Sequence, residues 1–145
     1  MIRFSSPRRI LPALFALAAA TIAGQAQAGD FLNDGAAAAC DTPWVLKAIE
    51  TRFQIQARNV LHAPDLTIDR FSRVHQHRLI AGAESRPIER RYCGADVQMS
   101  DGRKRYVWYL VEDRMGFAGV GDNVEFCVTG LDRWHVYGGH CRVLQ

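Results

Sequence analysis

The chain has 145 residues, 18 of them Lys or Arg and 15 of them Asp or Glu, and 48% of its residues are hydrophobic. Three of the arginines lie within the first 28 residues, whereas every acidic residue lies beyond them, so the remainder is close to electrically neutral. The formal net charge of +3 therefore gives no support for nucleic-acid binding.

Residues 1–28 have the form of an export signal. The arginines come first, an apolar run occupies residues 14–23, and Ala-Gln-Ala precedes Gly29. The apolar run is too short for a membrane-spanning helix, which needs roughly 20 residues, and no later stretch reaches that length. The sequence therefore predicts a periplasmic or secreted protein that begins near Gly29 and has no membrane span.

Residues 29–39 (GDFLNDGAAAA) are small and weakly patterned, which predicts a flexible lead-in. Residues 40–145 predict a single α+β domain whose modest core gains from cross-links. Since export leads to an oxidising compartment, the four cysteines favour disulfides over metal binding or catalysis.

A helix is predicted over residues 43–59. Asp41 or Thr42 can cap its start, and Pro43 suits the first helical position. An apolar stripe recurs at steps of three and four residues, as expected for a helix packed on one side; it comprises Leu46, Ile49, Phe53, Ala57 and Val60. Residues 66–79 then predict an edge strand with imperfect alternation.

Residues 91–99 and 104–111 predict a β-hairpin, because Asp101-Gly102 is a preferred centre for a two-residue turn. That turn places Ala95 opposite Trp108. The register predicts that Trp108 faces the helix and belongs to the core, together with the apolar residues of the first strand.

Further strands are predicted at residues 124–129, 134–137 and 140–144, after a glycine-rich loop at 116–123. The whole pattern predicts an α+β fold in which one N-terminal helix packs on a curled antiparallel sheet of four to six strands. A cystatin-like roll is the nearest analogy, and a fold alone does not establish a function.

Four cysteines allow three pairings. Cys93 is expected to point toward the helix that follows Cys40, which favours Cys40–Cys93 together with Cys127–Cys141. If residues 134–137 form a strand between the two outer strands, however, Cys127 and Cys141 lie about 10 Å apart, beyond the roughly 7 Å between Cα atoms that a disulfide tolerates. Cys93–Cys127 therefore stays open as an alternative.

Few residues suggest catalysis, and no cofactor is predicted. His75 and His77 stand two apart on a predicted strand, so both side chains fall on one face and are candidates for zinc or copper ligands. Because no third ligand stands in an evident motif, the sequence favours ordinary polar surface there and predicts no metal site. The even cysteine number argues against a free nucleophilic thiol. Glu112 and Asp113 are adjacent on a strand and point to opposite faces, which does not suit a pair of catalytic carboxylates.

Aromatic residues are concentrated in the sheet-forming half of the chain. Since the predicted register assigns Trp108 to the interior, Phe117, Trp134 and Tyr137 are the candidates for a binding surface. Exposed aromatic rings on a rigid sheet suit recognition of a protein or a glycan.

Three stretches resemble small exported four-cysteine proteins of alphaproteobacteria: RRYCGADVQMSDGR, WYLVEDRMGFAGVGDNVEFCVTG and DRWHVYGGHCRVL. They cover most of the predicted domain. That group has no established activity, so the resemblance implies export and a cysteine framework and carries over no catalytic residue.

The sequence thus predicts an exported, non-enzymatic binding or interaction domain. Its expected partner is an envelope or extracellular protein or a glycan, with no nucleic acid involved. The alternative is a small hydrolase or metal-binding protein that uses His75 and His77 together with Glu112.

Overall fold

The computed structural model describes residues 38–145. Helix α1 (Pro43–Gln56) continues into a π-helical turn, η1 (Ala57–Leu61). The strands are β1 (Ile68–Ile80), β2 (Arg90–Met99), β3 (Lys104–Glu112) and β4 (Asn123–Val128), and the 3₁₀ segments are η2 (Phe117–Gly119) and η3 (Gly139–Leu144). The predicted export signal and residues 29–37 of the predicted lead-in lie outside the described residues.

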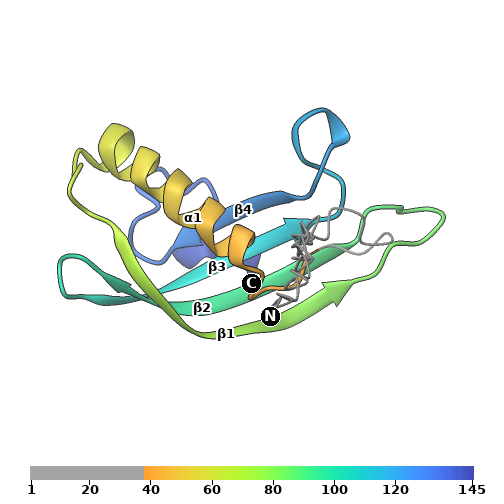
Figure 1. Ribbon diagram of the computed structural model, residues 1–145, viewed down its shortest axis with the longest axis horizontal. Coiled ribbons are helices and arrows are strands. Elements are labelled where there is room, and N and C mark those ends of the chain that lie inside the picture. The colour runs from red at the N-terminus through yellow and green to blue at the C-terminus, as the bar shows by residue number, and fades with distance from the viewer. Residues whose placement is uncertain (1–37) are drawn as a thin grey trace, which may run out of the picture.

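All four strands form one antiparallel sheet in the order β1-β2-β3-β4, and α1 lies across one face of it (Figure 1). This arrangement confirms the predicted α+β class, with one helix on an antiparallel sheet of four strands. β1 is an edge strand, as the sequence predicts. Among residues 38–145, no helix is long and apolar enough to cross a membrane.

Helix α1 begins where the sequence places it, with Pro43 at the first turn. The Thr42 hydroxyl makes no capping hydrogen bond, although the Thr42 carbonyl accepts from the N–H of Val45 at 2.9 Å. Beyond η1, His62 adopts a left-handed conformation with φ 55° and ends the helical segment. Pro64 follows two residues later, so the chain leaves the helix toward β1.

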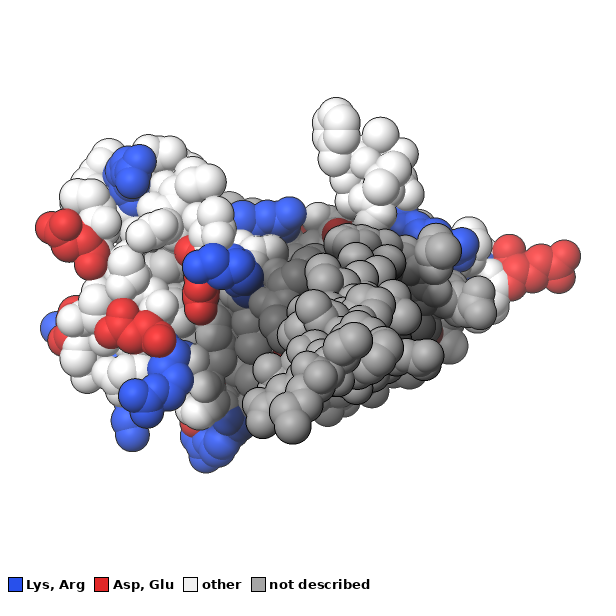
Figure 2. All heavy atoms as spheres, viewed as in Figure 1, with Lys and Arg blue, Asp and Glu red and all other residues white. Residues whose placement is uncertain are grey.

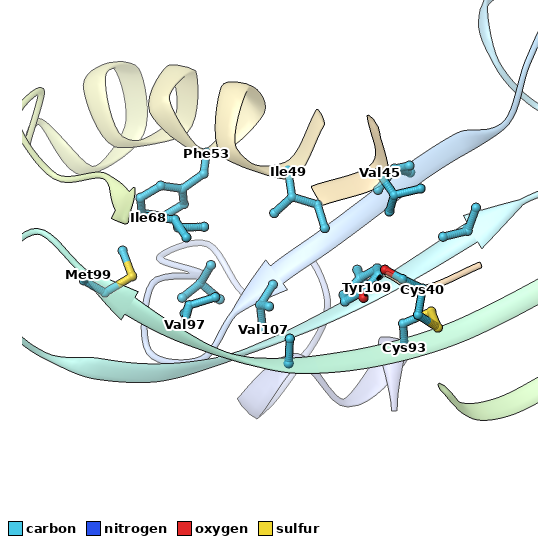
Figure 3. Packing of buried hydrophobic residues seen from close by; sticks show 14 of the residues in the cluster. Cys40, Val45, Ile49, Phe53, Ile68, Cys93, Val97, Met99, Val107 and Tyr109 are labelled. Atoms are coloured by element: carbon cyan, nitrogen blue, oxygen red, sulfur yellow. Dashed lines mark hydrogen bonds between the residues drawn. A yellow bond between two sulfur atoms is a disulfide. The ribbon is translucent and has the colours of Figure 1, made fainter. Parts of the chain in front are cut away.

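The inner face of the sheet, which is the face that carries α1, holds the main core. Val45, Ile49 and Phe53 are fully buried and point from the helix onto the sheet (Figure 3). Their partners alternate along the strands and include Val97 on β2 and Val107 on β3. Burying each such side chain stabilises the fold by roughly 1.5–3 kcal/mol, so this face dominates the stability of the domain.

A disulfide and a buried hydrogen bond hold the segment before α1 on the inner face. Cys40 forms a disulfide with Cys93 of β2. The buried Tyr109 hydroxyl donates a hydrogen bond to the Cys40 carbonyl at 2.7 Å, and burial raises the pKa of Tyr109, so this phenol stays a donor. The start of the helix is therefore fixed on β2 and β3 together.

The predicted hairpin exists, but its predicted register is wrong by one residue. Ala95 pairs with Val107, and Trp108 pairs with Gly94. Met99 N–H donates to Arg103 O at 2.9 Å, and Gly102 has φ +80°, so the loop contains three residues with glycine in the left-handed position. This is the second common hairpin loop, and the one-residue difference moves every side chain of β3 to the other face.

Trp108 therefore lies on the outer face of the sheet, opposite α1, and the prediction that it belongs to the main core is wrong. The outer face carries a second, smaller cluster with residues from β2, β3, β4 and the C-terminal segment. This outer cluster comprises Leu110, Cys127, Cys141 and Leu144, with Tyr92, Trp108 and Tyr137 packed against it. The domain thus has a helix-covered face and a face covered in part by its own C-terminus.

The predicted strands at 134–137 and 140–144 are wrong, because the chain beyond β4 forms turns and η3. The Asp132 carboxylate accepts hydrogen bonds from the N–H groups of Val136 and Tyr137, both at 2.9 Å, and so supplies the partner that a sheet would otherwise provide. His135 and His140 adopt φ values of 53° and 57°, which interrupt any extended conformation.

The structure contains a Cys127–Cys141 disulfide with a Cα–Cα distance of 5.7 Å. With Cys40–Cys93, these are the two pairs that the sequence favours. The geometric objection to the second pair required a strand at 134–137. Because that segment is a turn, η3 returns over the outer face and brings Cys141 next to Cys127.

Candidate binding surface

An open depression of about 250 Å³ lies beside the free edge of β4, between the end of the helical segment and the C-terminal turns. We call it the edge depression. Two of the three aromatic residues singled out from the sequence, Trp134 and Tyr137, line it. Its full lining comprises Gln56, Val60, Phe126, Cys127, Asp132, Arg133, Trp134, Val136 and Tyr137. Trp134 and Val136 are each 67% exposed, so a large apolar area faces solvent there.

Three polar side chains around the edge depression make hydrogen bonds within the protein. Gln56 Nε2 donates to Leu131 O at 3.2 Å, and Arg133 Nη1 donates to Val60 O at 3.3 Å. Asp132 holds the 134–137 turn through its two hydrogen bonds to main-chain N–H groups. These groups stabilise the walls of the depression, so the surface they leave for a ligand is mainly apolar.

The free edge of β4 is covered at both ends. The Arg52 guanidinium donates to Val124 O, and Leu131 N–H donates to Val128 O at 2.9 Å. Strand alternation directs the main-chain groups of Phe126 to this same edge, between the two covered carbonyls. Such covering limits uncontrolled strand pairing and leaves a short stretch of main chain beside the depression.

Tyr137 closes the depression on the outer side of β4. Burial raises the pKa of its phenol, and the nearby carboxylates of Glu125 and Asp132 raise it further. The phenol is therefore neutral at physiological pH and presents an uncharged ring, since the ordinary pKa of tyrosine is already about 10.

Phe117 does not join the other two aromatic candidates. It lies on the loop between β3 and β4, in the short segment η2, and its side chain is 96% exposed. This loop rises from the sheet on the side that carries α1, away from the edge depression at the far end of β4 (Figure 1).

His75 and His77 of β1 both contact aromatic rings of the outer face. His75 Nε2 lies 3.2 Å from the Tyr106 hydroxyl, and the His77 ring packs edge-on against Trp108 with 4.9 Å between centroids. Burial lowers the pKa of His77, and the positive charge of Arg78 lowers it further. The two imidazoles therefore pack against aromatic partners.

These histidines are not joined by further ligands. Among residues 38–145, no three His, Cys, Asp or Glu side chains come together in a group that would suit a metal ion. His135 and His140 line a separate hollow of about 320 Å³ with several glycines, and neither His75 nor His77 contributes to it.

Glu112 and Asp113 are nearly buried at the end of β3 and are held in ion pairs. Glu112 accepts from Arg90 Nε at 2.8 Å, and Asp113 accepts from Arg114 Nε at 3.1 Å. These pairs lie at the base of the loop between β3 and β4. The arrangement gives Glu112 a structural partner and does not place it with the histidines named in the alternative hypothesis.

No protein-family model, curated protein or solved structure matches the chain. The resemblance to small exported four-cysteine proteins of alphaproteobacteria therefore stays a prediction, as does the cystatin-like analogy.

The sequence identifies two lining residues of the edge depression as binding candidates, Trp134 and Tyr137. It places Val60 in the apolar stripe of the helix and Phe126 within a predicted strand, and nothing in either pattern marks a binding site. The missing signal was the turn at Asp132, since only this turn brings Trp134 back against the strand and the helix end. Asp132 precedes Val136 by four residues and Tyr137 by five, a spacing that suits such a turn. The aliphatic and aromatic residues that follow Asp132 suit a strand equally well.

Proposed function

We propose that this protein is an exported, non-enzymatic binding domain that holds an apolar side chain of an envelope or extracellular protein in the edge depression. The observation that carries the proposal is the aromatic wall formed by Trp134 and Tyr137 around an open volume of about 250 Å³. Clefts of this kind, apolar with a few fixed polar groups, are typical of recognition sites.

A protein partner suits the site better than a glycan. Sugar recognition requires several polar groups directed at the ligand, whereas this depression is lined mainly by apolar side chains and its one carboxylate, that of Asp132, is engaged in the 134–137 turn. An extended peptide segment offers an apolar side chain for the depression and main-chain groups for Phe126 at the edge of β4. This combination corresponds to strand addition at a sheet edge, in which main-chain hydrogen bonds give affinity and a pocket gives selectivity.

Two disulfides fit the proposed location in an oxidising compartment. They also matter for the site itself. Cys127 lines the edge depression, and its bond to Cys141 holds the C-terminal segment against the sheet. Reduction is therefore expected to weaken binding as well as stability.

The test is affinity capture from periplasmic extract and culture medium, with the oxidised protein starting at Gly29 as bait. Trp134→Ala removes one wall of the depression, and Trp44→Ala is the matched control because Trp44 is a half-exposed tryptophan at the start of α1. Buried aromatic residues at the centre of interfaces commonly contribute about 2 kcal/mol or more, so Trp134→Ala is expected to weaken capture about thirtyfold.

Trp44→Ala is expected to retain the same partner with unchanged affinity. The proposal fails if the wild-type protein retains no partner, or if the partner is retained equally well by Trp134→Ala. Substrate turnover that is lost on changing His75 or His77 but survives Trp134→Ala would favour the enzymatic alternative instead.

A further inference from the structure

The loop between β3 and β4 presents an unbroken apolar surface at residues 115–121, which we call the Phe117 loop. Residues 115–121 read MGFAGVG and contain no polar or charged side chain. Phe117 is 96% exposed, Val120 78% and Met115 45%. The loop stands clear of the domain, and in Figure 2 its projecting part carries no acidic or basic residue.

The main chain of this loop is hydrogen-bonded to itself. Gly116 N–H donates to Gly121 O at 2.8 Å, Gly119 N–H to Gly116 O at 2.9 Å, and Val120 N–H to Phe117 O at 3.1 Å. The two limbs run so close that a Cβ at position 116 would lie 2.2 Å from Val120 O, which only glycine avoids. Three N–H and three C=O groups of the loop therefore need no water.

The charges near the loop are confined to its base. The Asp113 carboxylate is nearly buried and paired with Arg114, and Asp122 accepts hydrogen bonds from Arg114 N–H at 3.2 Å and Ala38 N–H at 2.7 Å. Arg114 itself has a largely exposed side chain. The loop thus presents an apolar tip above an exposed cation, while its acidic groups are engaged in an ion pair and in hydrogen bonds to main-chain N–H groups.

We propose that the Phe117 loop inserts its tip into the interfacial region of a phospholipid membrane, with Arg114 at the level of anionic headgroups. This inference is independent of the edge depression and of its protein partner. It gives the exported domain a peripheral contact with a lipid surface and requires no membrane-spanning segment.

Three features favour lipid over a pocket in a partner protein. A bilayer interior cannot satisfy polar main-chain groups, and three N–H and three C=O groups of this loop are satisfied within it. Protein interfaces surround an apolar anchor with a polar rim, whereas seven successive residues of this loop have no polar side chain. The exposed arginine matches the attraction between basic residues and anionic lipid headgroups.

The contact is expected to be weak and reversible. Burial of one phenylalanine side chain strengthens partitioning between about tenfold and about a hundredfold, and valine adds less. A single lipid chain gives only marginal membrane binding, with an association constant of about 10⁴ M⁻¹, and the tip of this loop is of comparable or smaller apolar area. The loop therefore positions the domain at a membrane without anchoring it permanently.

The experiment is co-sedimentation of the oxidised protein starting at Gly29 with two kinds of vesicle. One contains phosphatidylethanolamine and phosphatidylglycerol, and the other contains phosphatidylcholine alone. Phe117→Ser is the test variant and Val120→Ser a second one. Ile55→Ser is the matched control, because it removes an exposed apolar side chain of α1 that lies outside both the loop and the edge depression. All variants keep both disulfides, and circular dichroism verifies that they fold.

The proposal predicts that the wild-type protein and Ile55→Ser bind vesicles equally. Phe117→Ser weakens binding at least about tenfold, and Val120→Ser weakens it less. Anionic vesicles are preferred about fivefold, with the preference reduced by salt. The proposal is overturned if neither vesicle binds the wild-type protein, or if Phe117→Ser binds as well as the wild type. It is also overturned if Phe117→Ser binds vesicles normally but loses a captured protein, since the loop is then a protein anchor.

Discussion

The two faces of the sheet are built in different ways. The inner face is held by a continuous apolar core beneath α1, in which Ile49 and Phe53 contact the alternating residues of the strands. The outer face is covered by a segment without regular strands, held by the Asp132 carboxylate and the Cys127–Cys141 disulfide. This difference indicates that the inner face provides most of the stability, while the outer face and the adjoining edge of β4 are free to carry a binding surface.

The largest loss of stability is expected from a substitution at the inner face. Phe53→Ala removes a fully buried ring from the centre of the core and is expected to lower the free energy of unfolding by about 4 kcal/mol. Urea denaturation followed by circular dichroism measures this change, with Phe53→Leu as a milder control. A loss below about 1 kcal/mol would contradict the central role of this core.

Removing the C-terminal cross-link is expected to have the next largest effect. The Cys127→Ala/Cys141→Ala double variant opens a disulfide that spans 14 residues, which corresponds to about 3 kcal/mol in the chain-entropy account. Hydrogen exchange is expected to accelerate in residues 131–145 while protection of α1 persists below the unfolding transition. Equal loss of protection in α1 and in the C-terminal segment would show that the two faces are not separable.

Asp132→Ala tests the turn that replaces a strand in the C-terminal segment. The substitution leaves the N–H groups of Val136 and Tyr137 without their partner and is expected to cost about 2 kcal/mol. Asp132→Asn keeps one acceptor oxygen and is expected to lower the stability by about half as much as Asp132→Ala. Thermal unfolding of the three proteins measures the series, and identical midpoints would show that the carboxylate does not hold the turn.

The smallest expected effect is the pH dependence of stability that His77 contributes at the outer face. Burial, with the charges of Arg78 and His75, lowers the pKa of His77, and a hydrogen bond that the imidazole donates to the Leu144 main-chain carbonyl offsets this in part. A lowered folded-state pKa means that the unfolded chain takes up the proton first, so the contribution of His77 is complete above about pH 6.5 and is lost as pH falls from there through the folded-state value.

Urea midpoints of the wild type and of His77→Gln at about pH 8 and about pH 5 measure this contribution. The wild type is expected to lose slightly more stability on acidification than His77→Gln. If the two proteins respond to pH identically, the His77–Trp108 contact does not depend on the neutral imidazole.

The helix was predictable because its apolar spacing has one dominant period, and the hairpin was predictable because Asp101-Gly102 marks a turn between two runs of strand-forming residues. The hairpin register was not, since β3 is apolar on both faces: Val107, Tyr109 and Val111 alternate with Tyr106, Trp108 and Leu110. Either register buries a credible set. A two-residue type I′ turn requires positive φ at both Asp101 and Gly102, whereas only Gly102 of the two has positive φ, so the loop takes three residues and Trp108 faces outward.

The C-terminal segment escaped prediction for a related reason. Its hydrophobic residues suit strands, but the two N–H groups bound by Asp132 and the left-handed His140 are incompatible with a continuous ladder. The binding residues Trp134 and Tyr137 were named from their aromatic character alone. Their meeting with Val60 and Phe126 depends on the turn, and no periodicity in the sequence specifies it.

The most direct test of the account is a hydrogen-exchange comparison of the oxidised protein alone and with the partner retained in the capture experiment. The account predicts added protection in residues 56–60 and 126–137, which surround the edge depression, and no change at the start of α1 near Trp44. Added protection confined to β1 around His75 and His77, with none beside β4, would contradict it.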